Sequence, residues 1–182
     1  MPAPAYFTRD MLLDLPEDGN RYELVRGELL VTPAPRPWHE IVTRRLDTAV
    51  VAYIERQRLP FYVVGSRSEL SWGRQDTEVQ PDLFVVPLVQ AQLLEWDQMR
   101  DVLLVVEVLS PSTARHDRFT KRLEYQRRGV PLYWIIDPDA RVVEVWTPED
   151  HFPRFERERL NWMPEGATAP FTLALGGLFQ AL

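Results

Sequence analysis

The stretch VLLVVEVLS, residues 102 to 110, is an apolar run with one charged interruption, Glu107. A continuous apolar run of this length is typical of a strand that is covered on both faces of its sheet. A carboxylate in such a strand is costly to bury unless a cation or hydrogen-bond donors compensate it. The stretch therefore predicts a central strand and, beside Glu107, a cation or hydrogen-bond donors that compensate the carboxylate.

The segment HDRFTKRLEYQRRG, residues 116 to 129, follows this strand and contains Lys121, the one lysine among 21 Lys and Arg residues. It predicts a helix that Gly129 ends, with Asp117, Lys121 and Tyr125 on one face. Arginine is a rigid planar cation, whereas lysine is a compact charge on a flexible stem, so a site that needs an ammonium cannot use arginine. A solvated surface helix on which one lysine remained by chance is the alternative.

Periodic apolar segments on both sides of this strand and helix supply the rest of the predicted core. With a long helix from Pro37 to Ile54, the order along the core is α, β, β, β, α, β, which indicates an α/β fold with a mixed sheet. An N-terminal helix and a hairpin that turns at Arg26–Gly27 precede the core. A candidate edge strand at 155 to 160 and an apolar tail, which packs on the body or on a partner, follow it. The core strands are expected at residues 61–72, 79–87, 102–110, 132–138 and 141–148.

Asp82 raises the same question as Glu107, because the residues after it are apolar and Pro81 before it cannot donate a ladder hydrogen bond. If the two predicted strands are neighbours, Asp82 and Glu107 come together, and two like charges in an apolar setting cannot both ionise without a cation. Mg²⁺ suits such a pair, since it prefers oxygen ligands and is commonly held by one or two carboxylates. For either acid alone, an ion pair with arginine is the simpler interpretation.

Further polar residues flank these two acids. A two-residue turn at Arg26–Gly27 places Glu23 and Glu28 on one face of the hairpin, where either could equally be an ordinary exposed acid. Gln80 shares the strand face of Asp82 and is a candidate contact to a metal-bound water. No histidine spacing suits a metal site, and structural or surface positions are expected for all three histidines: His39, His116 and His151.

Five segments, in this order and spacing, resemble the Uma-type family of bacterial proteins in the PD-(D/E)XK restriction-endonuclease-like superfamily. They are YELVRGEL, VQPDLFVV, VVEVLSPST, HDRFTKRLEY and GVPLYWIIDP, and the resemblance covers residues 6 to 147. It implies that Asp82 is the PD acid and Glu107 the acid of the second half-motif, and that both hold a metal, with Glu23 as an additional ligand. The motif lysine should stand two residues after Glu107, where this chain has Leu109. The resemblance implies that Lys121 supplies that charge from the following helix.

The same resemblance implies a restriction-endonuclease-like core and a Mg²⁺-dependent endonuclease that hydrolyses phosphodiester bonds of nucleic acid. DNA is the expected substrate, Mn²⁺ is expected to substitute for Mg²⁺, and a homodimer is expected. Lys121 would orient the nucleophile or stabilise developing charge, while Arg118 and Arg122 would contact flanking phosphates. The alternative is a catalytically degenerate nuclease-fold module that binds nucleic acid or a protein partner.

Composition limits the remaining possibilities. A chain of 182 residues with 45% hydrophobic and 26% charged residues suits one globular domain over residues 1–182. The net charge of −6 argues against a generic nucleic-acid coat, since non-specific affinity comes from neutralised phosphates. Without cysteine, a signal-peptide pattern or an apolar run long enough to span a bilayer, a cytoplasmic protein without membrane contact is expected. A soluble oligomer built by the apolar tail is a third possibility.

Overall fold

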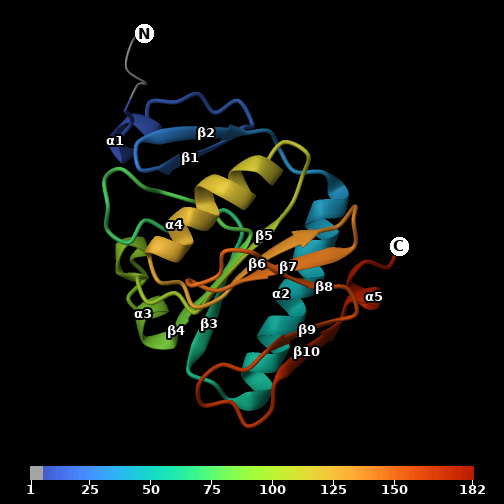
Figure 1. Cartoon of the computed structure of the whole chain (residues 1–182). Coiled ribbons are helices and arrows are strands. Elements are labelled where there is room, and N and C mark those ends of the chain that lie inside the picture. Colours follow the sequence, from blue (N-terminus) through green and yellow to red (C-terminus); the bar gives the residue numbers. More distant parts are fainter. Residues whose placement is uncertain (1–5) are drawn as a thin grey trace.

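A mixed sheet of six strands forms the centre of the computed structural model, which describes residues 6–182 (Figure 1). Strands β5 and β6 run parallel, while their neighbours in the sheet pair antiparallel. A parallel step needs a crossover connection, and the predicted basic helix provides it. The strands lie in the order β3 (Phe61–Gly65), β4 (Leu83–Pro87), β5 (Leu104–Val108), β6 (Tyr133–Asp137), β7 (Val142–Trp146) and β8 (Arg154–Glu156).

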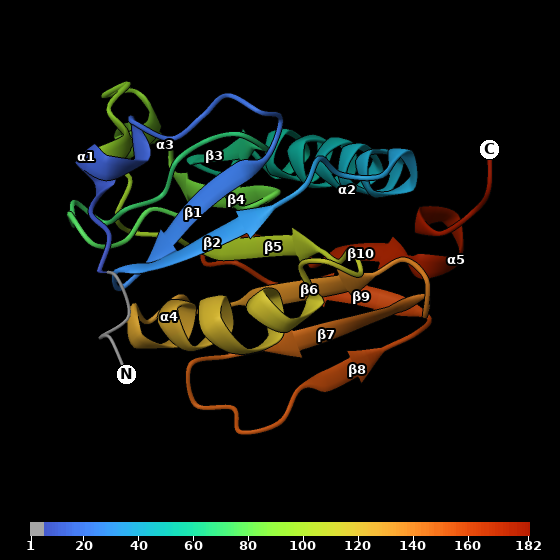
Figure 2. The same ribbon diagram turned by 90° about the horizontal axis from the view of Figure 1, so that it is seen from above.

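Two long helical segments cover opposite faces of the sheet (Figure 2). Helix α2 (Pro37–Gln57) begins with proline at its first position, as expected, and packs its apolar side on β4, β5 and β6. The other face carries a π-helical segment, His116–Lys121, which continues directly as α4 (Arg122–Arg127). Along the core the order α, β, β, β, α, β is therefore confirmed, and every residue of β5 is buried.

A separate hairpin packs beside α4 and is formed by β1 (Arg21–Val25) and β2 (Glu28–Thr32). Its two-residue turn has positive φ at both Arg26 (51°) and Gly27 (82°), which is the conformation that a tight hairpin of this kind needs. The predicted register is confirmed, because Glu23 pairs with Leu30. A bridge from Leu24 to Glu78 ties the hairpin to the body and leaves the neighbouring Glu23 facing inward, 1% exposed.

Two predicted strands were too long. The segment predicted at 61–72 leaves the sheet after Gly65, and the segment predicted at 79–87 enters it only at Leu83. Between them Leu70 and Val79 form one isolated bridge. Pro81 lacks the N–H that a continuous ladder would require, so the strand starts just after it and Asp82 stands at the strand entrance.

The C-terminal part adds a second small sheet of β9 (Arg159–Trp162) and β10 (Phe171–Ala174), followed by helix α5 (Leu175–Leu178). The predicted edge strand at 155–160 is divided between β8 and β9, because the chain changes sheets there. Phe171, Leu175 and Leu178 are buried in the same apolar cluster as the α2 side chains. The tail thus packs on the body of the chain.

Three further helical segments are short turns. They are α1 (Arg9–Leu12), α3 (Leu88–Ala91) and a 3₁₀ turn (Trp96–Gln98). Within residues 6–182, no helix has both the length and the apolar character needed to cross a membrane.

Candidate active site

A buried cluster of one lysine and three carboxylates lies between the hairpin, β5 and the helix that follows β5. The Nζ of Lys121 is 2.9 Å from Oε1 of Glu23, 3.0 Å from Oε1 of Glu107 and 3.2 Å from Oδ1 of Asp117. All four residues are 2% exposed or less. The contact with Glu107 is a hydrogen bond, whereas those with Glu23 and Asp117 are ion pairs, and Oδ1 of Asp117 has no hydrogen-bond partner among residues 6–182.

The helix that carries Lys121 is unusual where it meets the cluster. Residues His116–Lys121 are π-helical, a rare geometry that is often found at functional sites. Asp117, Lys121 and Tyr125 share the buried face of this helix, as their spacing predicts. The hydroxyl of Tyr125 donates a hydrogen bond of 2.8 Å to Oε1 of Glu107, the same oxygen that Lys121 contacts.

Asp82 stands next to this cluster but has different partners. Strand register pairs Leu83 with Val106, and one further step along the antiparallel ladder brings Asp82 to Glu107. Oδ2 of Asp82 accepts hydrogen bonds from the backbone N–H of Val108 (2.7 Å) and from Nε2 of His39 (3.0 Å). Within residues 6–182 no ion pair joins Asp82 to Lys121, so the predicted trio meets through Glu107 rather than at one point.

The second oxygen of Asp82 is only weakly compensated. Its Oδ1 is buried without a hydrogen-bond partner among the described residues, and Nη1 of Arg21 lies 3.5 Å away. The same Nη1 donates a hydrogen bond of 2.7 Å to the backbone carbonyl of Gln80, whose own N–H donates to Glu23 at 2.8 Å. Arg21 and the Gln80 backbone therefore connect Asp82 to the lysine cluster.

Burial and nearby charges shift the pKa values of Asp82 and Glu107 in opposite directions. Burial alone would raise the pKa of Asp82, but the hydrogen bond and charge of His39, together with the charge of Arg21, outweigh it, so its pKa lies below the usual value. For Glu107, burial prevails over the ammonium of Lys121 and nearby acids add to it, so its pKa is raised well above the usual value. Two acids with separated pKa values are typical of a catalytic pair.

Lys121 itself is held in its charged form. Burial would lower its pKa, but the charges of Glu107, Glu23 and Asp117 outweigh burial and raise the pKa well above the usual value. An ammonium with a raised pKa does not accept a proton near neutral pH. Lys121 can supply positive charge and hydrogen-bond donors, but it is a poor general base in this arrangement.

An open pocket of about 670 Å³ reaches Asp82 from the solvent. Its walls come from the segment before β1, from the loop between β2 and α2, and from the loops that flank β3 and β4. Acidic side chains outnumber basic ones among the residues that line it. The charged residues are Glu17, Glu40, Glu69, Glu78 and Asp82, against Arg21 and Arg67.

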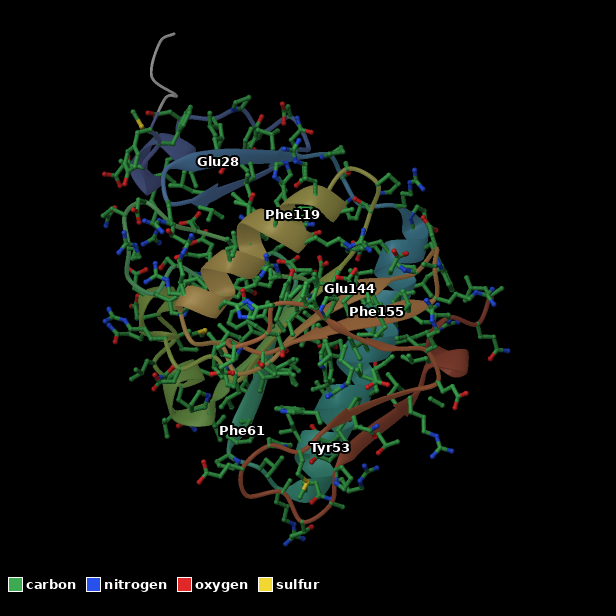
Figure 3. All side chains as sticks on the ribbon, viewed as in Figure 1. Glu28, Tyr53, Phe61, Phe119, Glu144 and Phe155 are labelled. Carbon is green, nitrogen blue, oxygen red and sulfur yellow. The ribbon has the colours of Figure 1, made fainter. Side chains whose placement is uncertain are left out.

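Arg118 and Arg122, the predicted phosphate contacts, are engaged within the chain. Arg118 donates to Glu144 (2.6 Å) and to Asp137 (3.1 Å). Arg122 lies over the ring of Trp146, 4.6 Å from its centre, and donates to the carbonyl of Arg118. Figure 3 shows Glu144 on β7 below the helix. Their contact with nucleic acid stays a prediction that would require an exchange of partners.

The other predicted residues lie outside the cluster around Lys121. Glu28, at the turn end of the hairpin, is exposed and lies outside the cluster (Figure 3). Leu109, at the position of the motif lysine, is 7% exposed and packs in the apolar cluster on the α4 face. His116 is partly buried and His151 is exposed. Of the three histidines, only His39 meets a predicted site residue.

Sequence spacing did not point to His39 or Arg21 as partners of Asp82. His39 lies in the first turn of α2 and Arg21 begins β1, so both approach Asp82 only through tertiary packing. Asp117 shares a helix face with Lys121, as predicted, and its contact with that ammonium adds a fourth buried acid to the site. The signal for Asp117 was its position four residues before the lysine.

One known protein family matches most of this chain. A family model described as "Uma2: Putative restriction endonuclease" matches residues 9–178. The chain belongs to the Uma2 family. A nuclease-like function follows from that membership, and the resemblance of the five sequence segments is confirmed. The Uma2 model reaches beyond residue 147 to include the second small sheet and α5.

A solved structure supports the fold of this Uma2 chain. It is described as "a putative nuclease belonging to DUF820" from Anabaena variabilis, and its TM-score is 0.76 at 21% sequence identity. The match covers 95% of this chain and 97% of that chain. The restriction-endonuclease-like architecture is thereby confirmed over nearly the whole length. No curated protein matches the sequence.

Proposed function

We propose that this protein is a divalent-cation-dependent endonuclease that cuts DNA, with Mg²⁺ as the physiological cation and Mn²⁺ as a substitute. One observation carries the proposal: the acids expected from the sequence, Asp82 and Glu107, are neighbours in buried positions, with a lysine ammonium 3.0 Å from Glu107. They stand on a restriction-endonuclease-like sheet, and Asp82 lines a pocket that is open to solvent.

The residues of the cluster suit a hard cation in chemistry. Glu23, Asp82 and Glu107 offer carboxylate oxygens, and in the described part of the chain no hydrogen-bond donor contacts the buried Oδ1 of Asp82. Within residues 6–182 no group of three or more His, Asp or Glu side chains is arranged to hold a metal ion as the structure stands. Three of the four carboxylates converge on the ammonium of Lys121 instead. We infer that Asp82 and Glu107 would hold the cation, with Glu23 beside them.

Each residue has a role that its surroundings support. A bound divalent cation would polarise a phosphoryl oxygen and make a bound water more acidic. His39 and the N–H of Val108 fix one oxygen of Asp82, so that the other stays directed at a ligand. Lys121 supplies positive charge where negative charge develops on the phosphate. The acidic lining of the pocket disfavours a bare phosphodiester, so substrate binding should itself depend on the cation.

Degenerate binding without catalysis is the second candidate function. It is supported by Leu109 at the motif lysine position and by the three buried ion pairs of Lys121 with carboxylates. A permanently ion-paired ammonium would act only as a structural counter-ion. A homodimer and a cytoplasmic location stay predictions beside either candidate, and sedimentation at micromolar concentration tests the first of them.

Cleavage assays separate the two candidates. Supercoiled plasmid, linear duplex, single-stranded DNA and RNA are incubated with Mg²⁺, Mn²⁺ or EDTA. The proposal predicts cation-dependent cleavage of DNA that Asp82→Asn and Glu107→Gln abolish, while Asp139→Asn, at an exposed position, leaves it intact. Retention of DNA in gel-shift experiments without cleavage of any substrate would favour the degenerate module.

A further inference from the structure

The position of the Lys121 ammonium has the features of a cation site that is already filled. Three carboxylate oxygens, from Glu23, Glu107 and Asp117, surround Nζ at 2.9 to 3.2 Å. These three acids come from β1, β5 and the π-helical segment, so the fold assembles them from distant parts of the chain. Buried like charges of this kind repel one another strongly unless a cation lies between them.

The same arrangement prevents Lys121 from reaching a substrate. Its Nζ is buried and ion-paired to three carboxylates, so contact with a phosphate oxygen or a water requires that at least one of these ion pairs be broken. The four-carbon stem of lysine allows the ammonium to move without a change in the backbone. The π-helical turn holds Asp117 next to Lys121, while Glu107 keeps a second hydrogen-bond donor, Tyr125, when the lysine leaves.

A second observation points to a cation beside the lysine. Oδ1 of Asp82 has no hydrogen-bond partner among residues 6–182, and Nη1 of Arg21 lies 3.5 Å from it. Asp82 is 2% exposed and lines the acidic pocket. The backbone N–H of Gln80 donates to Glu23 and its carbonyl accepts from Arg21, so Asp82 and Glu23 are held at neighbouring places. Oδ1 of Asp82 is thus linked, through Arg21 and the Gln80 backbone, to Glu23, one of the carboxylates that the ammonium now contacts.

We propose that the Lys121 ammonium is a placeholder for a divalent cation: Glu23 and Glu107 exchange the ammonium for the cation, and the released lysine turns toward the substrate phosphate. The exchange rests on the proposed cation dependence. It explains why the position is lysine, since arginine could not leave three carboxylates by a simple rotation of a flexible stem. It also couples cation binding to the availability of Lys121, so that an enzyme without its cation keeps its lysine withdrawn.

The single lysine makes the exchange directly observable. Protein labelled with ¹⁵N,¹³C-lysine gives signals from one lysine side chain only, because Lys121 is the only lysine in the chain. The Nζ and Cε signals are followed while Mg²⁺ is added to the full chain, and calorimetry measures Mg²⁺ binding in parallel. The proposal predicts that the lysine signals shift or broaden along the same binding curve as the calorimetric signal.

Two outcomes would overturn the proposal in distinguishable ways. Calorimetric binding of Mg²⁺ with unchanged lysine signals refutes the exchange and leaves the proposed nuclease function standing. An absence of both Mg²⁺ and Mn²⁺ binding refutes the exchange and the cation dependence together, and makes Lys121 a permanent counter-ion. Both measurements use the wild-type chain, so neither depends on the folding of a variant.

A variant supplies a quantitative check. Lys121→Met removes the competing ammonium, and Mn²⁺ should then bind about tenfold more tightly or better, since the cation no longer displaces an ion-paired group. Arg154→Met is the matched control, because Arg154 forms an exposed ion pair with Glu156 far from the cluster. Its Mn²⁺ affinity should equal that of the wild type, and an affinity of Lys121→Met equal to or weaker than wild type contradicts the exchange.

Discussion

The Nζ of Lys121 lies 3.0 Å from Oε1 of Glu107, although the two residues are 14 positions apart and belong to a helix and a strand. This contact joins the interrupted apolar strand to the single lysine of the chain. In the superfamily pattern that the sequence resembles, the lysine would stand on the strand itself, at the position of Leu109. Here the helical segment that follows β5 carries Lys121, whose ammonium contacts Glu107.

Asp82 controls the titration of His39. Burial lowers the pKa of His39, but the hydrogen bond to Asp82 and the charge of Asp82 outweigh it, so the pKa is raised above the usual value. Asp82→Asn should therefore lower the pKa of His39, as measured by NMR titration of the imidazole signals, while exposed Asp139→Asn leaves it unchanged. An unaltered His39 titration in Asp82→Asn would show that the 3.0 Å contact does not form in solution.

Glu107 should make the wild type less stable as the pH rises. Its pKa is raised in the folded state, chiefly by burial, so the folded state binds more protons than the unfolded state above pH about 4. Stability from this group is present at low pH and is lost as the pH rises toward the raised pKa. Urea unfolding of wild type and Glu107→Gln should show the variant gaining relative stability from pH 4 to 8. A loss across that range would reverse the sign that burial implies.

Arg118 should matter for folding before it matters for substrate. Its guanidinium pairs with Glu144, whose side chain is 5% exposed, so Arg118→Ala leaves a buried carboxylate without its cation. We expect the free energy of unfolding to fall by about 1–3 kcal/mol. Arg154→Ala, which breaks an exposed pair, should change it by less than about 1 kcal/mol. Equal effects of the two substitutions would mean that the Arg118 pair is no more than a surface contact.

Tyr125 should stabilise the site through its hydroxyl. Tyr125→Phe removes the donor to Glu107 at a fully buried position, and the free energy of unfolding should fall by about 1–3 kcal/mol. The matched control is Tyr22→Phe, whose hydroxyl donates to Asp18 at the surface and whose loss should cost little. A Tyr125→Phe protein as stable as the control would show that Lys121 alone satisfies Glu107.

The sequence predicts the strands and helices of the core better than their ends. Apolar runs identify β4, β5 and β6, and the turn at Arg26–Gly27 sets the register that turns Glu23 inward. The strand limits near Pro81 and Gly65 depend on which backbone groups find partners in the folded chain, so the predicted strands there were too long. A local sequence pattern predicts the structure well where a single turn, such as Arg26–Gly27, determines the backbone geometry.

The candidate site also contains residues that the sequence indicates and contacts that it does not. Glu107 and Lys121 stand out locally, one as a charge in an apolar strand and the other as the only lysine. The contacts of Asp82 with His39 and Arg21 were missed, because three separate elements meet at Asp82 only in the folded chain. Such contacts carry no periodicity that a single sequence can reveal.

The most direct test of the account is a crystal structure of the wild-type protein soaked in Mn²⁺, with anomalous data collected to locate the ion. We expect an anomalous peak at ligand distance from Oδ1 of Asp82 and a carboxylate oxygen of Glu107, with Nζ of Lys121 moved away from Glu107. The contradicting result is a map without a peak at this position, in which Lys121 still contacts Glu23, Glu107 and Asp117.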